Sequence, residues 1–150
     1  MAEKIEYIQQ VTFRIAKEIY GVDIHQVQEI IMMQDITQIP HAHDFVEGVL
    51  NLRGNVIPVV DLRRRLNFEP QEYGRNTRIV VVSVEEKIIG IIVDKVEEVT
   101  ELSSDCIEPP PAMLSGIGRE YLKGVGKRND RIIILLDINK IFNSEEIEQL

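Results

Sequence analysis

The sequence predicts an all-β fold in which two similar small units pack against each other. Aromatic residues make up only 5% of the chain and Trp is absent, so the core must consist mainly of Ile, Val and Leu. The β-branched residues in that set favour strands. Residues 11–66 and 78–142 also contain the same motifs in the same order, which indicates an internal repeat. With 150 residues, the chain can form one domain or two small units that share a core.

The repeat rests on matching motifs at matching spacing. Gly21 and Gly90 each open a similar stretch, and a proline follows nineteen residues later in both copies. The motif Phe45-Val-Glu-Gly-Val is answered by Tyr121-Leu-Lys-Gly-Val, and an Asp follows thirteen residues after the glycine in each copy. One unit of about sixty residues would bury only a marginal core, so we expect the two units to pack together. Five or so short strands per unit suggest a small closed or nearly closed barrel, which removes exposed edge strands.

The first copy has the alternation of apolar and polar residues that is typical of half-buried strands. In chain order its expected elements are a hairpin over 11–24, one helical turn over 25–29, an extended segment over 30–39, a loop or short helix over 41–47, and a strand, tight turn, strand and short basic helix over 48–66. The last of these stretches is the most distinctive, because its apolar strands flank a turn that contains a charged residue.

The second copy follows a polar connector over 67–76, which contains Pro70 and Gly74. Its expected elements are a hairpin over 78–93, an extended segment over 96–102, an irregular stretch over 113–122, a turn over 127–130, a strand over 131–137, and helical segments over 138–142 and 144–150. Three consecutive prolines from Pro109 onward stop any regular element. Ser144 is the expected N-cap of the last helix, with acidic residues in its first turn.

The composition excludes several classes of partner. The chain has 17 Lys and Arg against 25 Asp and Glu, a net charge of −8, which argues against general affinity for nucleic acid or for an anionic membrane surface. Its first residues contain no apolar stretch of signal-peptide length, and its longest apolar runs are too short to span a bilayer. We therefore expect a soluble, cytoplasmic protein without direct membrane insertion.

The sequence contains no motif that predicts catalysis or a bound cofactor. The single cysteine, Cys106, excludes an internal disulfide and has no local nucleophile partner, and the Gly-x-Gly pairs lack phosphate-loop spacing. His41 and His43 could share a metal, but no third ligand is evident besides the distant His25. We expect no enzyme activity, no cofactor and no metal. The alternative is a small acidic β-barrel enzyme or metal-dependent regulator, in which these histidines or the strand-end Asp residues converge.

Two basic features remain. Arg53 lies at the hairpin tip, next to Gly54, where a guanidinium could hold a partner's carboxylate with two bonds or bind loop carbonyls of its own chain. The run Arg63–Arg65 is either a solvated helix face or part of an interface.

The pattern Gly48-Val-x-Asn-Leu-Arg-Gly-x-x-x-Pro-Val-x-Asp-Leu-Arg-x-x-Leu66 closely resembles the signature of the CheW-type chemotaxis coupling proteins. The motifs around Tyr20, Val27, Gly90 and Glu120 extend this resemblance over residues 10–145. It implies two SH3-like five-stranded β-barrel subdomains in a pseudo-two-fold arrangement, possibly with exchanged strands. It also implies a non-catalytic adaptor that couples the cytoplasmic tips of chemoreceptors to the histidine kinase CheA, whose regulatory domain shares this fold.

The resemblance also implies site residues. Those for the receptor are Val27, Glu29, Gly48, Arg53, Ile79 and Val99, of which Ile79 and Val99 are expected on a groove between the barrels. Those for the kinase are Met113 and Leu114, in a loop where some relatives have an aromatic residue in place of Met113. A fragment of the kinase, or of a receiver-fused adaptor, is the competing interpretation within this family. The start at Met1 and the capped final helix favour a complete single domain over residues 1–150.

Overall fold

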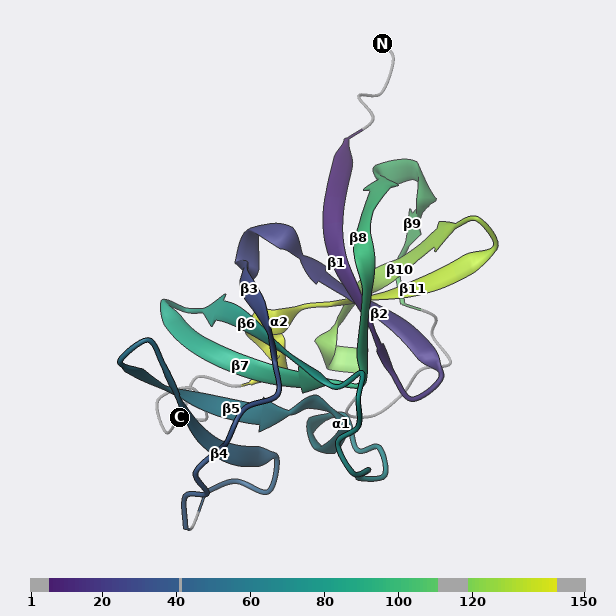
Figure 1. Cartoon of the computed structure of the whole chain (residues 1–150). Helices are drawn as coiled ribbons and strands as arrows, with labels where there is room; N and C mark the ends of the chain where they lie inside the picture. The colour runs from purple at the N-terminus through teal and green to yellow at the C-terminus, as the bar shows by residue number, and fades with distance from the viewer. Residues whose placement is uncertain (1–5, 41, 111–118, 143–150) are drawn as a thin grey trace.

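The computed structural model describes residues 6–40, 42–110 and 119–142. Within them the chain is mainly extended, as Figure 1 shows. The strands are β1 (Tyr7–Ile15), β2 (Glu18–Asp23), β3 (Val27–Met32), β4 (Val46–Leu52), β5 (Asn55–Asp61), β6 (Arg78–Val84), β7 (Lys87–Val93), β8 (Lys95–Ser103), β9 (Ile107–Glu108), β10 (Leu122–Arg128) and β11 (Arg131–Leu136). The helical segments are η1 (Ile24–Gln26), α1 (Leu62–Arg65), η2 (Ser104–Cys106), η3 (Arg119–Tyr121) and α2 (Ile138–Ile141). The expected all-β class is confirmed.

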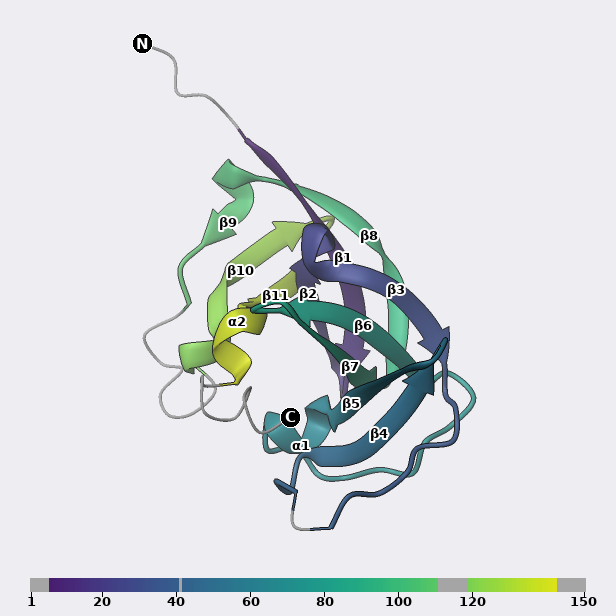
Figure 2. The ribbon, with the colours of Figure 1, turned by 90° about the vertical axis from the view of Figure 1, so that its left-hand side faces the viewer.

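The strands form two sheets. Sheet A has the order β8-β1-β2-β11-β10-β9, and sheet B has the order β3-β6-β7-β5-β4. The first hairpin of each sequence copy lies in a different sheet from the rest of that copy. In sheet A, β1 and β2 of the first copy pair with β8 and β11 of the second copy. In sheet B, β6 and β7 of the second copy pair with β3 and β5 of the first copy. The ladders curl in the manner of SH3-like units without closing into complete cylinders (Figure 2). Strands are therefore exchanged between the two sequence copies.

The pairing within the sheets repeats as the sequence does. Gly21 of β2 pairs in parallel with β11, and Gly90 of β7 pairs in parallel with β5. A register shift lies at Val46/Gly48 in the β4–β5 pair and at the matching place, Leu122/Gly124, in the β10–β11 pair. The internal repeat is thus a repeat of structure, and it relates sheet A to sheet B.

Each copy ends in the same capped helical turn. Asp61 caps α1 by accepting a hydrogen bond from the Arg63 amide (3.0 Å), and Asp137 caps α2 by accepting one from the Asn139 amide (3.1 Å). These strand-end aspartates therefore have the backbone role that helix caps usually have.

Three apolar clusters stabilise the two sheets. The largest lies between them and includes Phe13, Val80, Val82, Leu136 and Phe142, contributed by both sequence copies. Smaller clusters fill the concave sides of sheet B and sheet A. Because the central cluster is the largest, we infer that packing of the two sheets supplies much of the stability.

Some local predictions differ from the structure. The helical turn expected over 25–29 is η1, which ends at Gln26, and the chain is extended from Val27 onward. The turn expected over 127–130 is shorter, because β10 continues to Arg128 and only residues 129 and 130 form the turn. The helix expected over 144–150 lies outside the described residues. None of the helices in the described part of the chain is long and apolar enough to cross a bilayer.

Candidate partner-binding surface

The tip of the β4–β5 hairpin has the backbone that its sequence predicts. Arg53 and Gly54 both have positive φ (50° and 88°), as a two-residue type I′ turn requires. The Asn51 side chain accepts a hydrogen bond from the Gly54 amide (2.9 Å), which fixes the turn from one side. The Arg53 side chain therefore projects from a rigid tip.

Arg53 binds a carboxylate of its own chain. Its Nη1 donates to Oε1 of Glu29 over 3.0 Å, and its Nη2 donates to Oε2 of the same side chain. Glu29 belongs to β3, one edge of sheet B, and Arg53 follows β4, the other edge, so the ion pair joins the two edges across the curled sheet. The hydrogen bonds from Arg53 lower the pKa of the Glu29 carboxyl. The Arg53 side chain is still 70% exposed, which leaves this oriented guanidinium accessible to a partner.

The orientation of β3 follows from its pairing with β6. Val27 pairs with Val82 and Ile30 pairs with Val80, and both β6 residues lie in the cluster between the sheets. Directly paired residues on antiparallel strands point to the same face of a sheet, so Val27 and Ile30 lie at the edge of the central cluster. Ile30 is 42% exposed.

Sheet A has the matching arrangement at β8. Val96 pairs with Phe13 and Val99 pairs with Val11, again residues of the central cluster. Val99 is 53% exposed. We call Val27 with Ile30 the β3 rim and Val96 with Val99 the β8 rim. The two rims are equivalent under the repeat, and β3 and β8 run along the same side of the molecule in Figure 2.

The rims contain two residues beyond those predicted. Ile30 and Val96 belong to the rims but were not predicted from the sequence. The signal was present in the repeat, because the spacing that matches Gly21 with Gly90 also matches Ile30 with Val99 and Val27 with Val96.

Ile79 and Gly48 are not surface groups. Ile79, expected on a groove, is instead fully buried in the cluster inside sheet B, where it pairs with Ile31. Gly48 is buried, and a Cβ there would lie 2.2 Å from the Thr37 carbonyl oxygen. Thr37 bonds to Val49 through both backbone groups (2.9 Å each), so Gly48 permits this close approach. Any contribution of these two residues to binding must act through packing and backbone position.

The basic run after β5 is neither a solvated helix face nor a free basic patch. The Arg63 side chain is 8% exposed and donates to both oxygens of Asp94, at 2.8 Å from Nε and 2.7 Å from Nη2, and to the Glu69 carbonyl (2.8 Å). Asp94 also accepts from the Ala16 amide (2.8 Å) at the β1–β2 turn. Arg63 therefore connects α1 to the junction between the sheets.

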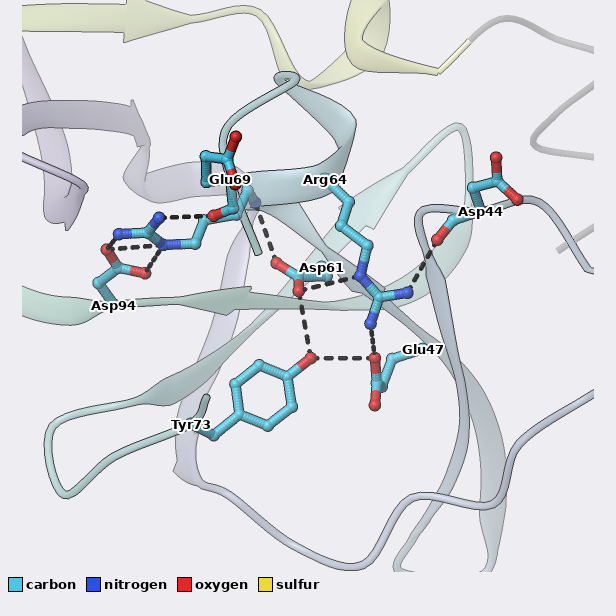
Figure 3. Close-up of polar contacts among 8 residues, drawn as sticks. Asp44, Glu47, Asp61, Arg64, Glu69, Tyr73 and Asp94 are labelled. Carbon is cyan, nitrogen blue, oxygen red and sulfur yellow. Dashed lines mark hydrogen bonds and ion pairs between the residues drawn. The ribbon is translucent and has the colours of Figure 1, made fainter. Parts of the chain in front are cut away.

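Arg64 belongs to the polar network in Figure 3. It pairs with Glu47, lies 3.3 Å from Asp61 and donates to the Asp44 carbonyl (2.9 Å). The Tyr73 hydroxyl lies 3.0 Å from Glu47 and 3.2 Å from Asp61. Burial, followed by the charge of Asp61 and the contacts with Glu47, raises the pKa of Tyr73 above its ordinary value. This network fixes the connector after α1 against β4.

Arg65 connects the two halves of the repeat. Its guanidinium lies over the rings of Phe45 (4.9 Å), Tyr121 (5.1 Å) and Phe142 (5.7 Å), and its Nε donates to the Ile141 carbonyl (2.6 Å). Phe45 and Tyr121 are equivalent in the repeat, so Arg65 lies where the two copies meet. All three arginines therefore contribute to the internal structure.

The remaining predicted sites lie elsewhere or outside the described residues. His25 bonds to Asp23 (2.9 Å) and His43 stacks on Phe45, with 5.1 Å between ring centroids. No three potential metal ligands gather among the residues that the structure describes. The predicted kinase contacts Met113 and Leu114, like His41, are not among those residues.

Comparison with known proteins agrees with this structure. The family model for the CheW-like domain matches residues 9–146. The chemotaxis protein CheW of Treponema pallidum is 37% identical, over 100% of this chain and 91% of that protein. The one from Klebsiella aerogenes is 38% identical, over 90% and 81%. The crystal structure of the scaffolding protein TtCheW from Thermoanaerobacter tengcongensis superimposes with a TM-score of 0.86 at 35% identity, covering 94% of this chain and 96% of that chain.

These similarities, together with two β units that carry paired apolar rims, define a scaffolding protein of chemotaxis. The chain belongs to the CheW-like family. Its relatives support an adaptor role in chemotaxis, in agreement with a protein that is not an enzyme.

Proposed function

We propose that this chain is the non-catalytic adaptor that couples chemoreceptor cytoplasmic tips to the histidine kinase CheA. The observation that carries the proposal is the pair of apolar rims. Each places an exposed aliphatic side chain, Ile30 or Val99, at the edge of the central core, where a partner can extend apolar packing that already exists. The buried core of a protein interface is its most apolar part, so these side chains can serve as anchors at the centre of such a contact.

On the receptor side, the β3 and β8 rims are the proposed anchors. Glu29 and Arg53 lie at the sheet B edge and supply orientation, since the Arg53 guanidinium is held at a fixed angle and remains exposed. Gly48 and Ile79 support this surface from within sheet B. A preorganised arginine loses less side-chain entropy on binding than a mobile one.

On the kinase side, the family resemblance points to the loop after the prolines, with Met113 and Leu114 as contacts. These two residues form a separate site from the rims along the sequence. Replacing both with Ala should weaken binding of the CheA regulatory domain while receptor affinity is unchanged, which calorimetric titration with each partner separately can measure.

The receptor proposal is tested by titrating a chemoreceptor tip fragment into the purified chain and its variants. We expect Val99→Asp to weaken binding at least tenfold, roughly 1.4 kcal/mol or more, because a charge replaces an apolar anchor. Arg53→Ala should also weaken binding while leaving the fold intact. The control is Ile132→Asp, a similar change at an isoleucine that is 55% exposed on β11, outside both rims and outside the hairpin of Arg53. Unchanged affinity in both rim and arginine variants, or equal loss in the control, would refute the proposed surface.

A further inference from the structure

The interior of sheet A differs in polarity from the interior of sheet B. The repeat matches Gln10, Thr12 and Thr100 in sheet A with Ile79, Val81 and Ile31 in sheet B. The three sheet A residues are at most 5% exposed, so polar groups occupy positions that the other unit fills with hydrocarbon. Burying polar groups costs stability unless they have partners. A packing role alone does not account for this difference.

A cavity opens at two of these polar positions, Thr12 and Thr100. It has a volume of about 480 Å³, which is within the range of small-molecule sites. Ile19 and Ile133 contribute an apolar wall, and Thr12 and Thr100 contribute hydroxyl-bearing residues. The remaining lining comes from β8 and the β10–β11 turn.

The Thr100 hydroxyl has no hydrogen-bond partner among the described residues, although Thr100 is only 5% exposed. Thr12 is different, because it donates to the Glu98 carbonyl (2.6 Å) and accepts from the Glu98 amide (3.1 Å). Every fully enclosed side-chain polar atom of the described residues has a partner, so the unpaired Thr100 hydroxyl retains some access to solvent, and Thr100 lines the cavity. Thr100 is thus a buried residue with an unpaired hydroxyl that lines a ligand-sized space.

The charges at the cavity mouth are also incompletely paired. In the repeat, Glu98 matches Glu29 and Asn129 matches Arg53, so the ion pair that joins the edges of sheet B has no counterpart in sheet A. Within the described residues neither the Glu98 carboxylate nor the Arg131 guanidinium has an ion-pair partner, and both residues line the cavity.

The other charged lining residues are already engaged. Glu97 pairs with Arg14, and Arg128 donates to the Glu101 carbonyl on β8. The mouth thus offers one available carboxylate and one available guanidinium beside an aliphatic wall. A ligand that matches these three features carries an ammonium group for the carboxylate, a carboxylate for the guanidinium and a short apolar body for the aliphatic wall.

We propose that this cavity binds a small zwitterion, an α-amino acid with an aliphatic side chain. The ammonium group bonds to the Glu98 carboxylate and the Thr100 hydroxyl, and the carboxylate bonds to Arg131. The aliphatic side chain packs on Ile19 and Ile133. Nothing in this inference depends on the receptor or the kinase, so it stands or falls separately from the adaptor function.

The test uses the full chain with leucine, valine and isoleucine as probes. We expect at least one of them at millimolar concentration to shift the backbone amide NMR signals of Thr100 and Ile133 saturably and to raise the melting temperature. For leucine, 4-methylpentanoate lacks the ammonium group and 3-methylbutylamine lacks the carboxylate. Each should bind roughly tenfold more weakly, since one charge-assisted hydrogen bond is lost.

Three variants complete the test. Glu98→Gln should weaken binding about tenfold, and Thr100→Ile, which installs the side chain found at the matching position of sheet B, should abolish binding in a folded protein. Glu101→Gln is the control, because Glu101 lies on the same strand and does not line this cavity. The proposal would be overturned by no saturable response to any of the three amino acids, by either singly charged analogue binding as tightly as leucine, or by an equal effect of the control variant.

Discussion

Arg53 is held by Glu29, a residue of the opposite edge strand, and both were predicted from the family resemblance as receptor contacts. The sequence left open whether Arg53 binds a partner's carboxylate or carbonyls of its own loop. In the structure the guanidinium pairs with a carboxylate of its own chain, that of Glu29, and donates to no loop carbonyl among the described residues. The hairpin tip therefore presents a guanidinium already oriented by an intramolecular pair. The second copy has a related contact, in which Arg128 from the β10–β11 hairpin binds the Glu101 carbonyl of β8.

At the residue scale, the pair predicts the titration of Glu29. The hydrogen bonds from Arg53 lower the pKa of this carboxyl in the folded chain. Its stabilising contribution is therefore fully present above the ordinary carboxyl pKa and is lost as pH falls through the lowered value. NMR titration of the Glu29 side chain should give a pKa below the ordinary range, and Arg53→Ala should return it to that range. An ordinary pKa in the unmodified chain would mean that the pair does not persist in solution.

At the scale of elements, the short helix α1 shows how a basic run can be internal. Arg63 binds Asp94, which in turn accepts from the Ala16 amide, so one buried arginine fixes the end of β7 and the β1–β2 turn to α1. The sequence pattern favoured a solvated face because three consecutive arginines on an acidic chain usually remain in water. Here α1 is only four residues long, and its side chains point in different directions toward separate partners.

We expect Arg63→Ala to lower the free energy of unfolding by about 2 kcal/mol, because it removes a buried arginine and leaves the half-buried Asp94 carboxylate without its cation. Urea denaturation measures this change. Arg75→Ala is the control, since Arg75 is exposed and its side chain makes no hydrogen bond or ion pair among the described residues. An effect no larger than that of the control would show that Arg63 does not fix α1.

Gly48 gives a second prediction at this scale. Its Cβ would lie 2.2 Å from the Thr37 carbonyl oxygen, so Gly48→Ala must push away the segment that bonds to Val49. We expect a loss of about 2–4 kcal/mol in thermal unfolding experiments. Gly74→Ala should change stability little, because nothing lies within 4 Å of a Cβ there and its φ is not positive. Equal effects of the two substitutions would contradict the proposed close approach.

At the scale of the whole molecule, the exchange of hairpins joins the two units. Sheet A needs β1 and β2 from the first copy, and sheet B needs β6 and β7 from the second. Neither sequence copy can therefore complete its sheet alone. Arg65 adds a further link, with contacts to Phe45 from the first copy and to Tyr121 and Phe142 from the second.

This architecture predicts a single cooperative unfolding transition. Urea unfolding followed by far-UV circular dichroism and by tyrosine fluorescence should give coincident curves, as a two-state protein does. Arg65→Leu should lower stability by about 2 kcal/mol, through loss of cation–π and hydrogen-bond contacts, without splitting the transition. Two separate transitions, in either protein, would show that the sheets unfold independently.

Much of the fold follows from local patterns in the sequence. The β-rich core composition, the hairpin at Arg53-Gly54 and the repeat itself were all predicted, and each agrees with the structure. Period-two alternation, turn chemistry and helix caps depend on neighbours within a few residues, which is why the printed sequence is sufficient for them.

Tertiary structure alone decided which surfaces and pairs these elements form. The contacts Arg53–Glu29, Arg63–Asp94 and Arg65–Ile141 span 24, 31 and 76 residues of sequence. The burial of Ile79 and the exposure of Ile30 likewise depend on which face of the β3–β6 pair meets the central cluster. Alternation shows that a strand has two faces, but only the packing of the second sheet determines which face is covered. The sequence by itself therefore determined the strands, the turns and the family resemblance, and the packing of the exchanged sheets determined the surface available to partners.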